Sequence, residues 1–286
     1  MQLSRAHVRN GKNRSRWRAT VLIICLVVVG TGGFVLDEMV QVRAPAKPGK
    51  KVLAVHPKPI TKTSPSLAGS KTTSQLVLPK QVLIKVPAQS QLPQLKNGCE
   101  VTTLSMLLAA VGHPINKMVL AKEEPLDPTK LVMDSKGNIQ YWGNPNVGFV
   151  GSISGYGYGI YHGPMTKFIN KLLPGSAKDL TGDSFSSIMA EVAKGHPVMV
   201  WTTATFQPTT LWQTWDSPEG SVRATMEEHA VLLVGWNGQH LLVNDPLTGV
   251  AAEAVDLKPF IAAWEQLGKQ AVTFIPQDTM ARPASY

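Results

Sequence analysis

Charged side chains are distributed very unevenly along this 286-residue chain, and their distribution limits which part of it can fold into a domain. Up to Lys85 the chain has fifteen basic and two acidic residues, whereas the remainder has thirteen basic and seventeen acidic ones. The net charge of +9 therefore belongs to the N-terminal part. Because a basic segment interrupted by many prolines cannot bury enough apolar surface to fold, we expect one globular domain in the last 190 or so residues, roughly the size of a single domain.

The N-terminal end has the pattern of a membrane anchor. Residues 1–18 carry six basic side chains and no acidic one, and residues 19–36 form an apolar run without a charge. Such a run is about long enough to cross a bilayer, which needs roughly 20 residues, and a basic flank is typical of the cytoplasmic side. We therefore expect a cytoplasmic tail at 1–18 and a single transmembrane signal-anchor at 19–36, with the following domain outside the cytoplasm. Secretion after cleavage is the alternative, although the small residues at 44–46 make a poor cleavage site.

Residues 37–83 are rich in Lys, Pro, Ser and Thr and predict a disordered linker. Its positive charge favours attraction to anionic lipid or to an anionic cell-wall polymer, and a solvated spacer explains it equally well. The charge gives no support to nucleic-acid binding by the later domain. We expect that domain at 84–278, followed by a short tail at 279–286.

Cys99 is the one cysteine that follows the apolar segment, since Cys25 lies inside it, so a disulfide is not expected. It stands where a loop changes into an apolar helical pattern. Asn97 is a suitable N-cap, and Glu100 a suitable capping-box partner. In the first turn of a helix, free N–H groups and the helix dipole favour a thiolate, which makes Cys99 a candidate nucleophile. The alternative is a small buried apolar side chain.

Two apolar β patterns at 229–236 and 240–246, separated by Asn-Gly, predict a hairpin. His229 opens the first strand and Asp245 closes the second. A three-residue loop with Gly238 in the left-handed conformation would place them face to face, whereas a two-residue turn would place them on opposite faces. Catalysis requires the contact, so we expect the three-residue loop.

Of the seven histidines, His229 is therefore the favoured general base, and His162 is the credible substitute. His196 precedes a proline at a strand start and is expected to be structural. Glu227 and Glu228 beside His229 could raise its pKa, but charged residues before a strand more often face solvent.

The remaining periodicity predicts an α+β fold, with a helix first and a mainly antiparallel sheet later. The stretch from the Cys99 helix to about 164 is expected to be rich in loops. The glycines and aromatics at 155–163 either line a peptide groove or pack a surface loop. Further elements are expected as helices at 165–173, 185–194 and 257–267 and as strands at 198–204, 230–236, 240–244 and 271–274.

The segments 91–103, 229–236 and 244–246 together resemble the papain-like bacterial cysteine peptidases related to the bacteriocin-leader-processing peptidase domain, peptidase family thirty-nine. The similarity covers about residues 84–276. It implies a papain-like α+β fold in which the helix of the nucleophile packs on a mainly antiparallel sheet. In that family a cysteine attacks, a histidine is the base, an aspartate orients the histidine, and a preceding glutamine donates to the oxyanion.

Carried over to this chain, the resemblance implies Cys99 as nucleophile, His229 as base and Asp245 as orienting group. Gln91 is favoured as the oxyanion donor, with Gln94 in reserve. Neither a cofactor nor a metal is expected.

These features together predict a membrane-anchored, extracytoplasmic cysteine peptidase acting on a peptide or protein. A cell-wall amidase or acyltransferase with the same triad is the nearer alternative, and a non-catalytic tethered binding module is the other. One apolar segment cannot form a transport channel, and no ATPase motif is present, which weakens a leader-processing role.

Overall fold

The computed structural model describes residues 78–275. The predicted anchor at 19–36, nearly all of the linker and the tail at 279–286 lie outside the described residues. Within residues 78–275, no helix combines the length and apolar character needed to cross a membrane.

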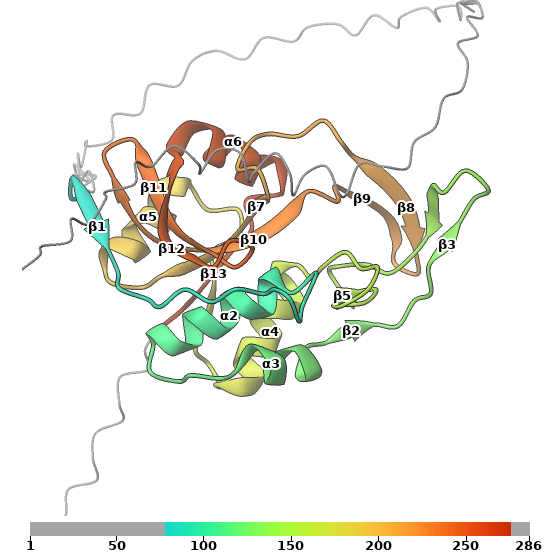
Figure 1. Cartoon of the computed structure of the whole chain (residues 1–286), viewed down its shortest axis with the longest axis horizontal. Coiled ribbons are helices and arrows are strands. Elements are labelled where there is room, and N and C mark those ends of the chain that lie inside the picture. Colours follow the sequence, from blue (N-terminus) through green and yellow to red (C-terminus); the bar gives the residue numbers. More distant parts are fainter. Residues whose placement is uncertain (1–77, 276–286) are drawn as a thin grey trace, which may run out of the picture. The chain divides into compact units, whose positions relative to one another are not determined.

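The centre of the domain is an antiparallel sheet (Figure 1). Its strands follow the order β12-β11-β10-β7-β13-β6, and β1 pairs with the end of β10. The two long central strands are almost wholly buried and read as continuous apolar runs, because both faces of the sheet are covered. The strands are β1 (Gln81–Leu83), β6 (Ala177–Asp179), β7 (Val198–Thr203), β10 (Glu228–Asn237), β11 (His240–Asp245), β12 (Val250–Asp256) and β13 (Ala271–Phe274).

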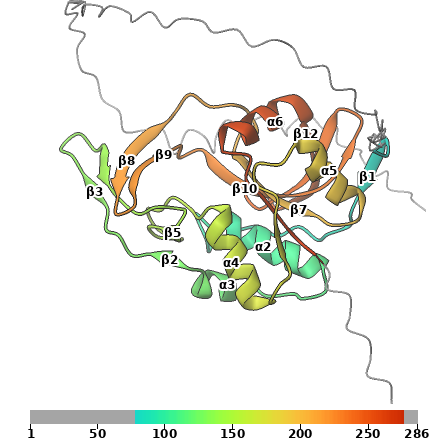
Figure 2. The same cartoon turned by 180° about the vertical axis from the view of Figure 1, so that it is seen from behind.

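Helices cover both faces of this sheet, as the two opposite views show (Figures 1 and 2). Along β10, Ala230 and Leu232 pack in the apolar cluster of α2 and α4, whereas Val231 and Leu233 pack in the cluster of α5 and α6. This alternation is the period of two that a strand imposes on its side chains. The helices are α2 (Cys99–Ala110), α3 (Lys117–Glu123), α4 (His162–Leu172), α5 (Phe185–Ala193) and α6 (Leu257–Gln266).

The region expected to be rich in loops contains α3 and part of a second sheet. This four-stranded sheet has the order β3-β4-β8-β9, and a separate parallel pair joins β2 to β5. Its small core includes Trp215, whose ring centroid lies 5.7 Å from that of Trp142 and 5.6 Å from that of Tyr158. The strands are β2 (Leu126–Asp127), β3 (Val132–Met133), β4 (Ile139–Tyr141), β5 (Phe149–Val150), β8 (Gln213–Ser217) and β9 (Gly220–Ala224).

Helix α2 is buried on all sides over most of its length, from Cys99 to Leu108. Its first half lies against β10, where the hydroxyl of Thr103 donates to the carbonyl of Ala230 at 3.1 Å. A helix enclosed in this way is held by packing rather than by its own helix propensity. The position of Cys99 relative to β10 is therefore fixed by the core.

The β10–β11 turn has two residues, but they are shifted by one position from the Asn237-Gly238 turn considered from the sequence. Asn237 pairs with His240, so Gly238 and Gln239 form a two-residue turn, with Gly238 at φ +60°. A left-handed residue in a tight hairpin turn is suited to glycine. The predicted three-residue loop is therefore wrong.

The extra residue lies inside β10 instead. The pairing of β10 with β11 shifts by one position at Val234, which is a β-bulge. The carbonyl of Val234 accepts the N–H of Ile84 at 2.8 Å, from the segment that follows β1. This edge segment is distant from the hairpin in the sequence. The hairpin sequence alone therefore does not predict the bulge.

Candidate active site

Cys99 is the first residue of α2, as the sequence predicts, but its helix is not capped as expected. Gly98 is the N-cap residue and no side chain caps the helix. The Asn97 amide donates instead to the carbonyls of Ser152 and Gly155, at 2.8 and 2.9 Å. Asn97 thus ties the loop before the nucleophile to a distant loop, and the predicted capping box is wrong.

Gly98 is required by a close approach in the backbone before the helix. A Cβ atom built on Gly98 would lie 2.4 Å from the Cβ of Leu95, which is buried. No side chain tolerates that distance without displacing the loop. The glycine before Cys99 therefore sets where the helix begins.

The thiol of Cys99 is buried, with 6% of the residue exposed, and it is a free cysteine. Its Sγ donates a hydrogen bond to Oε2 of Glu100 at 3.1 Å. The backbone N–H of Ala230 on β10 lies on the other side and favours the ionised sulfur. The sulfur is thus held against the residue that follows His229.

Burial raises the pKa of the Cys99 thiol well above its usual range, and the charges of Glu100 and Glu228 add to this effect. The N–H of Ala230 opposes the shift without reversing it. The surroundings of the sulfur therefore oppose the expected thiolate, because burial and two acidic neighbours act against the N-terminus of the helix.

The two glutamates near the sulfur are themselves unusual. Burial raises the pKa of Glu100, although the N–H of Ile160 donates to its Oε1 at 2.8 Å. Burial and the charge of Glu100 raise the pKa of Glu228 well above its usual range. Glu228 is half-buried as a residue, but its Oε1 is shielded from solvent and has no hydrogen-bond partner. Two such close carboxyl groups hold at least one proton between them.

These groups form the candidate ligand set for a metal among residues 78–275. The Cys99 sulfur and one carboxylate oxygen each of Glu100 and Glu228 lie within 4.8 Å of one another. Metal ligands must be deprotonated, however, and the pKa of each of these groups is raised.

The sheet brings His229 and Asp245 together in spite of the altered register. Leu232 pairs with Asn244, and one further step sets Asp245 opposite Val231. His229 lies two residues from Val231 and therefore on the same side of β10. The two side chains meet as diagonal neighbours across the strands.

The predicted contact between His229 and Asp245 is confirmed. The ring Nε2 lies 2.7 Å from Oδ1 of Asp245, and both residues are at least 97% buried. The same oxygen accepts the N–H of Leu247 at 2.8 Å. Burial disfavours the charged form, but these donors hold the pKa of Asp245 below its usual value. An ionised aspartate with Nε2 as its partner leaves Nδ1 as the nitrogen available for chemistry.

Of the two candidate glutamines, the structure favours Gln91. Gln91 is 3% exposed, and its backbone N–H donates to the carbonyl of Pro246, next to Asp245. Its side-chain N–H donates to the carbonyl of Lys96, three residues before the nucleophile. Gln94 is exposed and its amide oxygen accepts from Lys117.

The other histidines are bound elsewhere. The ring of His162 lies 2.7 Å from Asp179, and that of His196 lies 3.0 Å from Glu191. His196 is structural, as expected. The ring of His162 is partly exposed, so His162 remains the substitute candidate for the base.

Glu228 is the residue that the sequence analysis misplaced. It was expected to face solvent, yet its carboxylate lies beside the nucleophile. The signal for this was present, because Glu228 has the same parity along β10 as Ala230 and Leu232, which face α2.

Comparison with known proteins identifies the family of this chain. The model of the Peptidase C39-like family matches residues 83–272. YvpB, an uncharacterized protein of Bacillus subtilis strain 168, is 38% identical over 185 residues, which are 64% of this chain and 71% of that protein. The crystal structure of a candidate C39-like peptidase from Bacillus anthracis is 39% identical, with a TM-score of 0.62, and the match covers 70% of this chain and 99% of that one. The chain belongs to the Peptidase C39-like family, a membership that supports a peptidase-type function.

Proposed function

We propose that this chain is a cysteine peptidase that hydrolyses peptide bonds through Cys99, His229 and Asp245. The observation that carries the proposal is the buried His229–Asp245 pair at the start of β10, together with a free thiol that lies against Ala230, the residue after His229. A nucleophile, a base and a group that orients the base are the parts that acyl transfer requires.

The first step of the proposed reaction starts from a neutral thiol. His229 takes the thiol proton while the sulfur of Cys99 attacks the carbonyl carbon, so the C–S bond forms as the S–H bond breaks. Asp245 stabilises the resulting imidazolium. This order suits a buried thiol, because a general base removes the proton during the attack and no free thiolate has to exist beforehand. The thiol hydrogen turns from Glu100 toward the ring when substrate binds, since catalytic hydrogen bonds commonly tighten only in the complex.

The oxyanion and the leaving group complete the reaction. The backbone N–H of Cys99 and the second amide hydrogen of Gln91 donate to the oxyanion. His229 returns the proton to the leaving nitrogen as the C–N bond breaks, which leaves a thioester on Cys99. Water then attacks the thioester as it gives a proton to His229, and the C–S bond breaks as His229 returns this proton to the sulfur, which releases the acid product and restores the thiol.

A library of peptides incubated with the full-length protein tests the activity, with the products read by mass spectrometry. Cleavage by the wild type and none by Cys99→Ala is the expected result. The same pair of proteins incubated with peptidoglycan tests the amidase alternative. Release of fragments from peptidoglycan alone would replace the peptidase proposal, and equal cleavage by both proteins would exclude Cys99 as nucleophile.

We also propose that residues 19–36 anchor the protein and hold the domain outside the cytoplasm. The proposal is supported by the charge difference between residues 1–18 and the apolar run that follows. In cells that express the full chain, protein that resists alkaline extraction of membranes and a domain digested by protease added outside are expected. A domain protected from protease in intact cells would contradict this orientation.

A further inference from the structure

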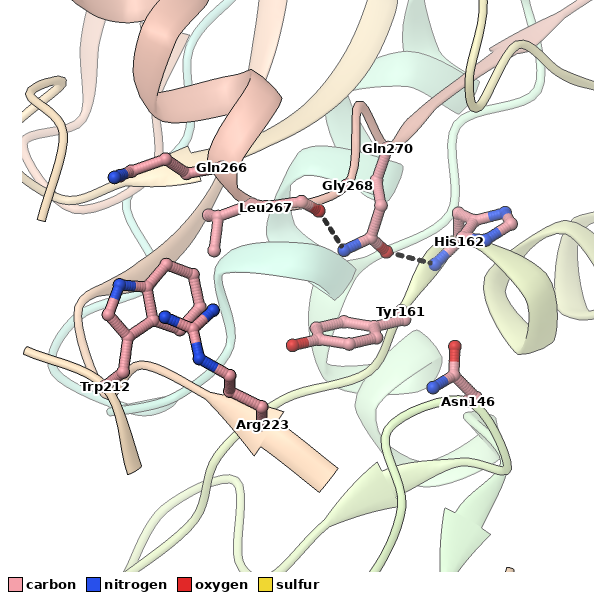
Figure 3. A pocket seen from close by; sticks show the side chains of 9 residues that line it. All are labelled: Asn146, Tyr161, His162, Trp212, Arg223, Gln266, Leu267, Gly268 and Gln270. Atoms are coloured by element: carbon pink, nitrogen blue, oxygen red, sulfur yellow. Dashed lines mark hydrogen bonds between the residues drawn. The ribbon is translucent and has the colours of Figure 1, made fainter. Parts of the chain in front are cut away.

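A pocket of about 290 Å³ lies between the start of α4, the end of α6 and strand β9 (Figure 3). Arg223 and Trp212 form one wall, and Tyr161 lies between them and the opposite wall. Polar amide groups complete the lining, and no acidic side chain belongs to it.

The guanidinium of Arg223 is held in place by an aromatic ring. Its central carbon lies 3.9 Å from the centroid of Trp212, which is a cation–π contact. The indole N–H of Trp212 donates to the carbonyl of Thr209, and Thr209 exchanges two hydrogen bonds with the amide of Gln266 on α6, at 2.9 and 3.1 Å. None of the ion pairs among residues 78–275 includes Arg223. The pocket therefore contains a positioned cation without a carboxylate partner.

The opposite wall is equally well fixed. The buried amide of Gln270 accepts the backbone N–H of His162 at 3.0 Å and donates to the carbonyl of Leu267 at 2.9 Å (Figure 3). The backbone N–H of Tyr161 donates to the carbonyl of Pro145. Because both walls are held by buried or backbone hydrogen bonds, the shape of the pocket does not depend on a bound ligand.

The pocket is close to the nucleophile along the chain segment that follows Tyr158. A Cβ on Gly159 would lie 2.3 Å from the carboxylate of Glu100 and 3.0 Å from that of Glu228, so Gly159 touches the groups around the sulfur. Tyr161 is two residues further on, and two residues span at most about 7 Å. A peptide bound at Cys99 can thus reach the pocket with a neighbouring residue.

We infer that this pocket binds a carboxylate of the peptide substrate, close to the bond that is cleaved. A planar guanidinium presents paired N–H donors that match the two oxygens of a carboxylate. The carboxylate belongs either to an acidic side chain or to the C-terminus of the peptide, and the chemistry of recognition is the same. The inference names the substrate class for the proposed peptidase and rests on that function.

Binding to full-length Cys99→Ala protein tests the pocket without turnover. Dye-labelled peptides that differ only in Glu against Gln, and in a free against an amidated C-terminus, are titrated by fluorescence anisotropy. A tenfold tighter binding of at least one carboxylate peptide than of its neutral partner is expected, from about 1.4 kcal/mol for a charge-assisted pair. The peptide pair that shows the preference identifies the source of the carboxylate.

The Arg223→Gln substitution in the same protein should reduce this preference to less than about twofold, and Arg223→Lys should keep part of it. Lys136→Gln, a change of the same charge on an exposed turn outside the pocket, should retain the full preference. Equal preference in Arg223→Gln and in Lys136→Gln, or no preference in either, would overturn the inference. If the active protein cleaves peptides without a preference for an acidic group, the inference about the pocket is wrong and the proposed peptidase function stands. If peptides bind in an acid-dependent way but none is cleaved, the proposed function is wrong and the binding site stands.

Discussion

The candidate site contains two kinds of carboxyl group, and their pKa values are shifted in opposite directions although both groups are buried. Asp245 receives hydrogen bonds from His229 and Leu247, and its pKa is lowered. Glu228 has an oxygen without a partner, and its pKa is raised. The comparison shows that burial alone does not set the pKa of an acid in this site, because the donors to Asp245 lower its pKa whereas the charge of Glu100 raises that of Glu228 further.

Each kind of acid has a consequence for the sulfur. Asp245 holds the ring of His229 in one orientation through its contact with Nε2. Burial and the charges of Glu100 and Glu228 disfavour a thiolate on Cys99. The surroundings of Cys99 therefore oppose ionisation of its thiol, and in the proposed mechanism His229 activates it.

The largest expected effect comes from the ionised acid. Asp245→Asn should lower kcat/KM for a cleaved peptide by roughly 10²- to 10⁴-fold, because the amide favours the wrong tautomer of His229. Asp256→Asn is the matched control on the same hairpin, since Asp256 faces His240 at 3.4 Å but is 70% exposed. A loss of activity of similar size in both variants would break the comparison.

A smaller loss of activity is expected from crowding the carboxyl group of Glu100. Gly159→Ala would force a methyl group within 2.3 Å of Glu100, which holds the thiol and the N–H of Ile160. We expect kcat/KM to fall about 10- to 100-fold, as misplacement near a reacting group typically costs. At Gly163 a Cβ meets nothing within 4 Å, so Gly163→Ala is the control. Unchanged activity in Gly159→Ala would show that Glu100 can move without consequence.

Removing the charge of Glu100 should make the thiol easier to ionise. Burial is the main cause of the raised pKa of Cys99, and the charge of Glu100 is the second cause. Glu100 also accepts the hydrogen bond of the thiol. In Glu100→Gln, alkylation of Cys99 by iodoacetamide near neutral pH should rise about two- to fivefold, since the thiolate is the reactive form. Peptide mapping by mass spectrometry measures the rate, and a slower alkylation would contradict the assigned role of Glu100.

The smallest effect concerns the stability of the fold. Burial, assisted by Glu100, raises the pKa of Glu124 to about 9, and neither carboxylate oxygen has a partner. Above its unfolded pKa the unfolded chain releases this proton while the folded protein keeps it, so stability falls as pH rises toward about 9.

Glu124→Gln should remove that pH dependence. Between about pH 6 and pH 8 the wild type should lose on the order of 1–3 kcal/mol, or a few degrees in Tm, that the variant does not lose. The exposed neighbour substitution Glu123→Gln should keep the slope of the wild type. The measurement is thermal unfolding at several pH values, and identical slopes in all the proteins would show that Glu124 ionises without cost in the folded state.

Elements with strong apolar periodicity could be predicted from the sequence. The strand at 271–274 has the predicted bounds, and α5 and α6 end one residue before their predicted ends. The hairpin of β8 and β9 was missed, although buried Trp215 and Val222 alternate with exposed neighbours around a Pro-Glu-Gly turn. Strand β12 is largely exposed or half-buried and lacks such a signal.

The residues of the candidate site could be predicted from the sequence, but the burial and charges around the thiol could not. The contact of His229 with Asp245 followed from their spacing on paired strands, although the bulge at Val234 changed the register. The raised pKa of the thiol could not be predicted, because it depends on burial and on Glu228, which is distant from Cys99 in the sequence. A local reading of the helix start gives the dipole and omits the desolvation.

The most direct test of this account is the rate at which iodoacetamide alkylates Cys99 in the wild type, in His229→Ala and in His240→Ala. The account predicts stoichiometric alkylation in the wild type, a rate at least about tenfold lower without His229, and no change without the exposed His240. Equal rates in the three proteins would mean that the imidazole does not activate the sulfur, and the proposed peptidase mechanism would be wrong.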